Sequence, residues 1–144
     1  MQKIYLKYPE ISEIKANIVS RRVQGDKTQI ILDRTIFMPI TIGLLSDTGK
    51  IDDLDIVSIE EKRDNIIHTV LGKPNKSEVT LKLDSNNRFK NLSYNTAFII
   101  FKLVFDSFYN ALDLKLNLEA DRSVIKIIDF FESLDTKLIE NQVN

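Results

Sequence analysis

The chain has 144 residues, of which 43% are hydrophobic and 28% charged, and its formal net charge is −1. This length and composition predict a globular protein of one domain or two very small ones, and the charge balance excludes a bulk attraction to nucleic acid. Because the chain has no cysteine and a single histidine, His68, disulfides, thiolate chemistry, cysteine zinc sites and paired-histidine metal sites are excluded.

The first 84 residues show the alternation of apolar and polar side chains that is typical of strands separated by turns. Residues 62–65 have the composition of a hairpin loop between two strands, and Asp52, Asp53 and Asp55 are expected to form a solvated turn. Short strands with frequent turns favour a small antiparallel β-barrel. The strands are expected at residues 4–6, 14–20, 29–32, 56–61, 66–71 and 78–84.

After residue 84 the spacing of the apolar residues becomes helical. Ser93 or Asn95 is expected to cap a helix that runs to about Leu112. Two short strands at residues 114–118 and 124–128 follow, and then a final helix that begins near Ser133 or Asp135. The sequence therefore predicts an α+β protein with two domains, 1–90 and 91–144.

The N-terminus lacks the apolar core of a signal peptide, and the longest apolar run has five residues, 97–101. A run that short cannot span a bilayer. We therefore expect a cytoplasmic protein with no membrane association.

One segment resembles a family motif. Residues Leu32-Asp33-Arg34-Thr35, Pro39 and Ser46-Asp47-Thr48-Gly49 agree in identity and spacing with the glycine-rich segment of the AlaX proteins and the editing region of alanyl-tRNA synthetase, roughly LDRTAFYPEGGGQPSDTG. The resemblance implies a translation-protein-type β-barrel followed by a truncated α+β editing-like domain. Further agreement lies at Ile66-Ile67-His68 (I-x-H), at Asp84, Arg88 and Phe89 (D-W-E-R-R-F), and at residues 95–99 (H-T-A-x-H).

The chemistry that the family implies is missing from this sequence. AlaX-type proteins use zinc to hydrolyse the ester that joins serine or glycine to tRNA-Ala, and the resemblance places two histidine ligands at Asn95 and Ile99. An amide is a poor zinc ligand and an aliphatic side chain is none. The remaining ligands come from a later Cys/His motif, which the chain is expected to lack because it ends before it. We therefore expect no catalytic residue, no metal and no cofactor, and a protein without enzymatic activity.

The retained motif residues are candidate contacts to RNA or another ligand. For Asp33, Arg34 and Asp47 the simpler expectation is that they hold turns and surface pairs together, and for His68 that it is an ordinary strand residue. The candidate contacts are Asp33, Arg34, Thr35, Gly43, Ser46, Asp47, Thr48 and Arg88.

Three functions follow from this pattern. The favoured one is an interaction or assembly module without catalytic activity, since every catalytic feature is eroded while the barrel pattern survives. The alternatives are a tRNA or aminoacyl-tRNA binding module, with weak binding, and a deacylase with metal-free chemistry. The helix is apolar around much of its circumference, which predicts a homodimer or a complex with another chain. The expected interface is Phe98, Phe101, Phe105 and Phe108, unless the barrel and the final helix, through Phe130, Phe131, Leu134 and Leu138, cover that face.

Overall fold

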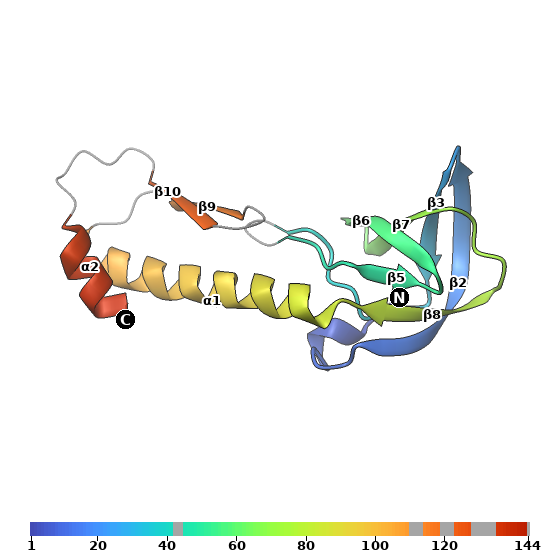
Figure 1. Cartoon of the computed structure of the whole chain (residues 1–144), viewed down its shortest axis with the longest axis horizontal. Helices are drawn as coiled ribbons and strands as arrows, with labels where there is room; N and C mark the ends of the chain where they lie inside the picture. Colours follow the sequence, from blue (N-terminus) through green and yellow to red (C-terminus); the bar gives the residue numbers. More distant parts are fainter. Residues whose placement is uncertain (42–44, 110–113, 119–122, 128–134, 144) are drawn as a thin grey trace. The chain divides into compact units, whose positions relative to one another are not determined.

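The computed structural model of the chain describes residues 1–41, 45–109, 114–118, 123–127 and 135–143 (Figure 1). It divides into two compact units, Met1–Phe89 and Lys90–Asn144. The division falls inside one helix, α1 (Ser85–Phe108), so that the first turn of this helix belongs to the first unit.

The first unit is built from antiparallel strands. Six of them follow one another in the order β2-β3-β7-β6-β5-β8, and β8 pairs with β2, so the sheet closes on itself. Two short strands, β1 and β4, pair in parallel beside it. The elements are β1 (Gln2–Lys3), a 3-10 helix (Ile4–Leu6), β2 (Glu13–Gln24), β3 (Lys27–Leu32), β4 (Arg34–Thr35), β5 (Gly49–Ile51), β6 (Leu54–Lys62), β7 (Asn65–Leu71) and β8 (Glu78–Leu83).

Tight turns connect the neighbouring strands. Arg63 and Asp64 join β6 to β7 and both have positive φ, 48° and 66°, which is the backbone of a type I′ hairpin turn. The hairpin predicted at residues 62–65 is therefore confirmed. Asp52, with φ 52°, turns the chain between β5 and β6. Of the three residues expected in an acidic turn, Asp52 is half-buried and Asp55 belongs to β6.

The core of the first unit is filled by the inward side chains of these strands. On β8, Val79 and Leu81 are buried, and Leu83 packs against the same core; on β2, Ala16 is buried. This is the alternation expected from the sequence. The buried apolar cluster consists of Ala16, Ile30, Leu32, Ile36, Phe37, Ile51, Ile59, Ile66, Val70, Val79 and Leu81.

The strand expected at residues 4–6 is wrong. The amides of Lys7 and Tyr8 both donate to the carbonyl oxygen of Ile4, at 3.0 and 2.9 Å, and this closes a helical turn. Leu6 is 69% exposed. This short alternating segment therefore forms a 3-10 helix and not a strand.

The start predicted for the long helix is also wrong. α1 begins at Ser85 because Asp84 caps it: the Asp84 carboxylate accepts a hydrogen bond from the Asn87 amide at 3.0 Å, the geometry of an N-cap. Ser93 and Asn95 consequently lie within the helix and do not cap it. The predicted end near Leu112 lies outside the described residues.

The second unit holds the rest of α1, a two-stranded antiparallel sheet of β9 (Leu114–Leu118) and β10 (Ser123–Ile127), and α2 (Thr136–Val143). Asp135 caps α2 by accepting a hydrogen bond from the Leu138 amide at 3.0 Å. The predicted strand pair and final helix are thus confirmed, as is the α+β class. No helix in the described part of the chain is long and apolar enough to cross a membrane.

Candidate functional site

Asp47, from the Ser46-Asp47-Thr48-Gly49 segment of the motif, is the centre of a buried ionic cluster. Its Oδ1 accepts a hydrogen bond from Arg88 Nε at 3.1 Å, and its Oδ2 pairs with Arg88 Nη2. The Met38 amide also donates to Oδ2, at 2.5 Å. The two charged side chains are only 6% and 1% exposed, so each charge depends on the other for its compensation.

Arg88 extends this cluster to the backbone of two further segments. Its Nη1 donates to the Pro9 carbonyl oxygen at 2.9 Å, and its Nη2 to the Ile36 carbonyl oxygen at 2.5 Å. One guanidinium in the first turn of α1 therefore joins chain segments near residues 9, 36 and 47. The polar atoms of Asp47 and Arg88, two of the candidate contacts to RNA or another ligand, are buried and are engaged inside the protein.

Thr48 and Gly49 attach the same segment to the end of β8. Thr48 Oγ1 donates to Asp84 Oδ2 at 3.4 Å, and the Asp84 amide donates to the Thr48 carbonyl oxygen at 2.9 Å. At Gly49 a Cβ would overlap the Lys82 carbonyl oxygen and approach Phe37 Cε1 to 2.9 Å. The glycine of the motif is thus required by the close approach of two backbones.

The first half of the motif, Leu32-Asp33-Arg34-Thr35, has a similar structural role. The Asp33 carboxylate accepts hydrogen bonds from the Asn17 amide at 2.8 Å and from Asn17 Nδ2 at 3.2 Å. Arg34 is exposed and pairs with Asp33 at 3.4 Å, in agreement with the expected surface pair. Among the candidate contacts, Arg34 and Thr48 are exposed, Asp33 and Ser46 are half-buried, and Gly43 lies outside the described residues.

Thr35 and His68 form a buried hydrogen-bonded chain. His68 Nδ1 lies 3.4 Å from the Ile30 carbonyl oxygen and Nε2 lies 2.9 Å from Thr35 Oγ1. A carbonyl only accepts, so Nδ1 carries the proton, Nε2 accepts from the Thr35 hydroxyl, and that hydroxyl accepts from the Phe37 amide at 3.1 Å. The hydroxyl of Thr35 is therefore engaged inside the protein. The same hydrogen bonds fix one neutral tautomer of His68, the only histidine in the sequence.

We expect this histidine to make the protein less stable as the pH falls. Burial lowers the pKa of His68 from 6.5 to about 4, although the Ile30 carbonyl partly opposes the shift. Between these values the unfolded chain binds a proton that the folded chain does not, so the free energy of unfolding should fall by about 2 kcal/mol from pH 7 to pH 5. Urea denaturation at the two pH values measures this change. His68→Gln should be less stable at pH 7 but should lose most of this pH dependence, and an equal slope in the variant would contradict the assignment.

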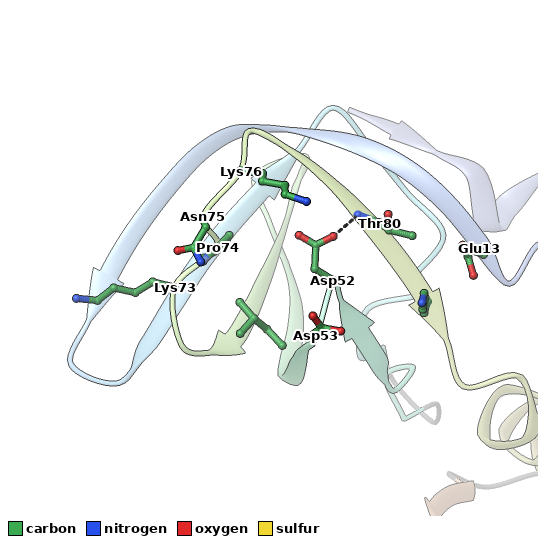
Figure 2. A pocket seen from close by; sticks show the side chains of 10 residues that line it. Glu13, Asp52, Asp53, Lys73, Pro74, Asn75, Lys76 and Thr80 are labelled. Atoms are coloured by element: carbon green, nitrogen blue, oxygen red, sulfur yellow. Dashed lines mark hydrogen bonds between the residues drawn. The ribbon is translucent and has the colours of Figure 1, made fainter.

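A pocket of about 430 Å³ lies beside the β5–β6 turn (Figure 2). Three acidic side chains, Glu13, Asp52 and Asp53, and three lysines, Lys73, Lys76 and Lys82, line it, so their formal charges cancel. Asp52 is already engaged, because its Oδ1 accepts a hydrogen bond from the Thr80 amide at 2.8 Å. This pocket is lined by charged side chains whose formal charges cancel, whereas pockets that hold small molecules are mostly lined by apolar side chains.

Asn95 and Ile99, where the resemblance places the histidine zinc ligands of the family, lie on α1. Ile99 is 50% exposed and Asn95 is half-buried four residues earlier. Neither side chain fits a zinc site, because one is an amide and the other a hydrocarbon. In the described part of the chain, no group of three or more histidine, cysteine, aspartate or glutamate side chains is arranged to hold a metal ion.

Ile99 belongs to an apolar stripe on α1 that sequence reasoning missed. Leu92, Ile99, Ile100 and Leu103 are 37%, 50%, 43% and 66% exposed, and Thr96 between them is exposed too. At 3.6 residues per turn, these five residues share one side of the helix. We call them the α1 stripe. Its signal, the spacing of residues 92, 96, 99 and 103, was present in the sequence, but exposure could not be read there.

The phenylalanines of α1 that were expected to form an interface differ in exposure. Phe105 is fully buried. Its ring stacks with Phe101 at a centroid distance of 5.8 Å and contacts the tilted ring of Tyr109 at 5.0 Å. Phe98 and Phe101 are half-buried, and Phe108 is 45% exposed. These residues lie on the side of the helix opposite the α1 stripe, and the packing within the chain already uses much of that side.

Comparison with known proteins agrees with the motif. No protein-family model matches the chain. Over 137 residues it is 32% identical to the alanyl-tRNA editing protein AlaX-L of Pyrococcus horikoshii. The match covers 88% of this chain and 33% of that relative, so the chain spans about a third of the relative's length. Together with the packing of the motif residues, this similarity shows that the chain is related to the AlaX-type alanyl-tRNA editing proteins.

Proposed function

We propose that this chain is a non-catalytic relative of the editing proteins and acts as an interaction or assembly module. The observation that carries the proposal is the environment of Ile99. At a position where the family presents a metal ligand, this chain presents a hydrocarbon that continues an exposed apolar stripe. An exposed stripe of this kind fits a protein interface and does not fit a hydrolytic centre.

The remaining ionisable groups of the motif support the same proposal. His68, the only histidine, is buried with both ring nitrogens facing hydrogen-bond partners. Asp47 and Arg88 compensate each other in the interior. A general base must reach the proton that it removes, and none of these three groups is positioned to reach a bound substrate.

The relationship also suggests the finer fold assignment. We propose that the closed sheet of the first unit corresponds to the translation-protein-type barrel of the family. Residues 91–144 would then correspond to part of the α+β editing domain. The positions of the Leu-Asp-Arg-Thr and Ser-Asp-Thr-Gly segments support this correspondence, because both are fixed against the strands by the contacts of Asp33, Asp47 and Gly49.

Binding of tRNA is the second candidate, because the similar protein is named for alanyl-tRNA editing. Lys73, Lys76 and Lys82 form the most evident group of cations near a hollow, but Glu13, Asp52 and Asp53 share that hollow. Affinity for nucleic acid comes largely from neutralised phosphates. We therefore propose that any tRNA binding is weak and strongly weakened by salt.

A deacylation assay tests the proposed function. Ser-tRNA-Ala and Gly-tRNA-Ala are incubated with the protein, with and without added zinc, beside an active AlaX protein as positive control. We expect release of amino acid no faster than in buffer, and far less than one zinc per chain by elemental analysis. Release that depends on protein concentration would overturn the proposal. Filter binding of tRNA at 50 and 200 mM salt tests the second candidate, a tRNA-binding module. Tight binding at the higher salt concentration would favour that candidate over the interaction module.

A further inference from the structure

We propose that the α1 stripe pairs with the same stripe of a second copy of this chain, as an antiparallel two-helix coiled coil. The inference rests on the proposed function and specifies its partner and its surface. It differs from the interface expected on the phenylalanines, which lie on the other side of α1.

The spacing of the stripe is that of a coiled-coil seam. Leu92, Thr96, Ile99 and Leu103 follow one another at intervals of four, three and four residues, which is the repeat of the a and d positions of a heptad. Ile100 lies at a flanking position beside this seam. The 24 residues of α1 give a helix of about 36 Å, so the stripe occupies a continuous part of an uninterrupted helix.

The stripe is complementary to itself when the second helix runs in the opposite direction. Each leucine at one end then meets a leucine of the second copy, because Leu92 lies opposite Leu103 and Thr96 lies opposite Ile99. The two-fold axis passes between residues 97 and 98. Every contact occurs twice, as symmetry requires of an interface between two identical surfaces.

The polar residues of the seam are compatible with burial. Thr96 Oγ1 already donates to the Leu92 carbonyl oxygen at 3.0 Å, so covering this side chain leaves no donor without an acceptor. Lys102, on the flank of the seam, falls near Asn95 of the second copy, and no pair of like charges is brought together there.

Charge decides between the two helix directions. The next position of the repeat after Leu103 is Asp106. In a parallel pair the two Asp106 carboxylates would face each other across the seam, which is unfavourable. In the antiparallel pair each Asp106 lies at the end of the seam, opposite residue 89 of the second copy, so the two carboxylates are far apart.

Light scattering coupled to gel filtration tests the association. At tens of micromolar the full chain should have twice the mass of one chain. Leu103→Asp should weaken the dimer at least about 100-fold, because the symmetric interface contains the substitution twice, and the mass should fall to that of one chain. Val19→Asp is the matched control, since Val19 on β2 is 67% exposed and Leu103 66%; this variant should remain a dimer.

Circular dichroism of Leu103→Asp must retain the helical signal, and Ile99→Asn provides a milder second variant at the same seam. A wild-type chain that is monomeric at these concentrations overturns the proposal. Leu103→Asp and Ile99→Asn both remaining folded dimers would also overturn it, while loss of the dimer in Phe108→Asp but not in these variants would place the interface on the opposite side of α1.

Cysteine cross-linking tests the direction, and the chain offers a clean background because it has no cysteine. Chains carrying Leu92→Cys and chains carrying Leu103→Cys should form a disulfide when mixed, and neither should do so alone. Cross-linking of each variant with itself would overturn the antiparallel arrangement. The deacylation assay is independent: a dimer that releases amino acid refutes the proposed function, and an inactive monomer refutes only the pairing.

Discussion

Arg88→Met is expected to lower the free energy of unfolding by about 3–5 kcal/mol, because it leaves the Asp47 carboxylate buried without its counter-ion. The Arg88 guanidinium is within hydrogen-bond distance of Asp47 and of two backbone carbonyl oxygens, on Pro9 and Ile36. A thioether satisfies none of these groups. Urea denaturation monitored by circular dichroism at pH 7 measures the difference from the unmodified chain.

An exposed ion pair provides the control for this experiment. Lys50 lies 3.2 Å from Asp55, and the two side chains are 53% and 64% exposed. Lys50→Met should change the free energy of unfolding by less than about 1 kcal/mol. Combining Arg88→Met with Asp47→Asn should cost less than the sum of the two single substitutions, because no uncompensated charge then remains inside. If Arg88→Met costs no more than Lys50→Met, the buried pair does not hold the segments near residues 9, 36 and 47 to α1.

Gly49→Ala is expected to destabilise the protein by at least about 3 kcal/mol. The added methyl group would overlap the Lys82 carbonyl oxygen, an atom of the β8 backbone that pairs with β5. Backbone in a closed sheet cannot rotate away as a flexible side chain can, so the strands themselves must separate. Thermal or urea denaturation reports the loss, and reduced soluble yield is expected with it.

Gly25→Ala is the matched comparison. Gly25 lies in the β2–β3 turn with φ 63°, and a Cβ there would meet no atom within 4 Å. Only the unfavourable left-handed backbone remains, which costs about 1–2 kcal/mol. Equal losses at the two glycines would show that backbone conformation alone, and not the close approach of β5 to β8, explains the glycine of the motif.

Local signals in the sequence were sufficient for much of the fold. The turn residues Arg63 and Asp64 lie between two alternating segments, and their hairpin has the predicted position. Alternation also predicted the inward side of β8. The start of α1 was missed because Ser85, Asn86 and Asn87 have weak helix propensity. There the cap by Asp84 and the buried contacts of Arg88 outweigh propensity, and both depend on the three-dimensional structure.

The role of the motif residues could not be predicted from their positions in the chain. Asp47 and Arg88 are 41 residues apart, and no local pattern indicates that they meet in the interior. Thr35 and His68 are similarly distant, 33 residues apart. Residues that agree with a family motif are therefore explained here by packing. On α1, the sequence showed that most of the circumference is apolar, but it could not show which side the chain itself covers.

The position of Arg88 has a consequence for the order in which the chain folds during synthesis. Of the strands in the closed sheet, the ribosome produces β2 first, but its partner β8 ends only at Leu83, and the cation that compensates Asp47 follows five residues later. A nascent chain that has not reached residue 88 therefore holds an unclosed sheet and an uncompensated carboxylate. Folding of the N-terminal strands should wait for the beginning of the helix, and a shortened protein intended to isolate these strands must extend past Arg88.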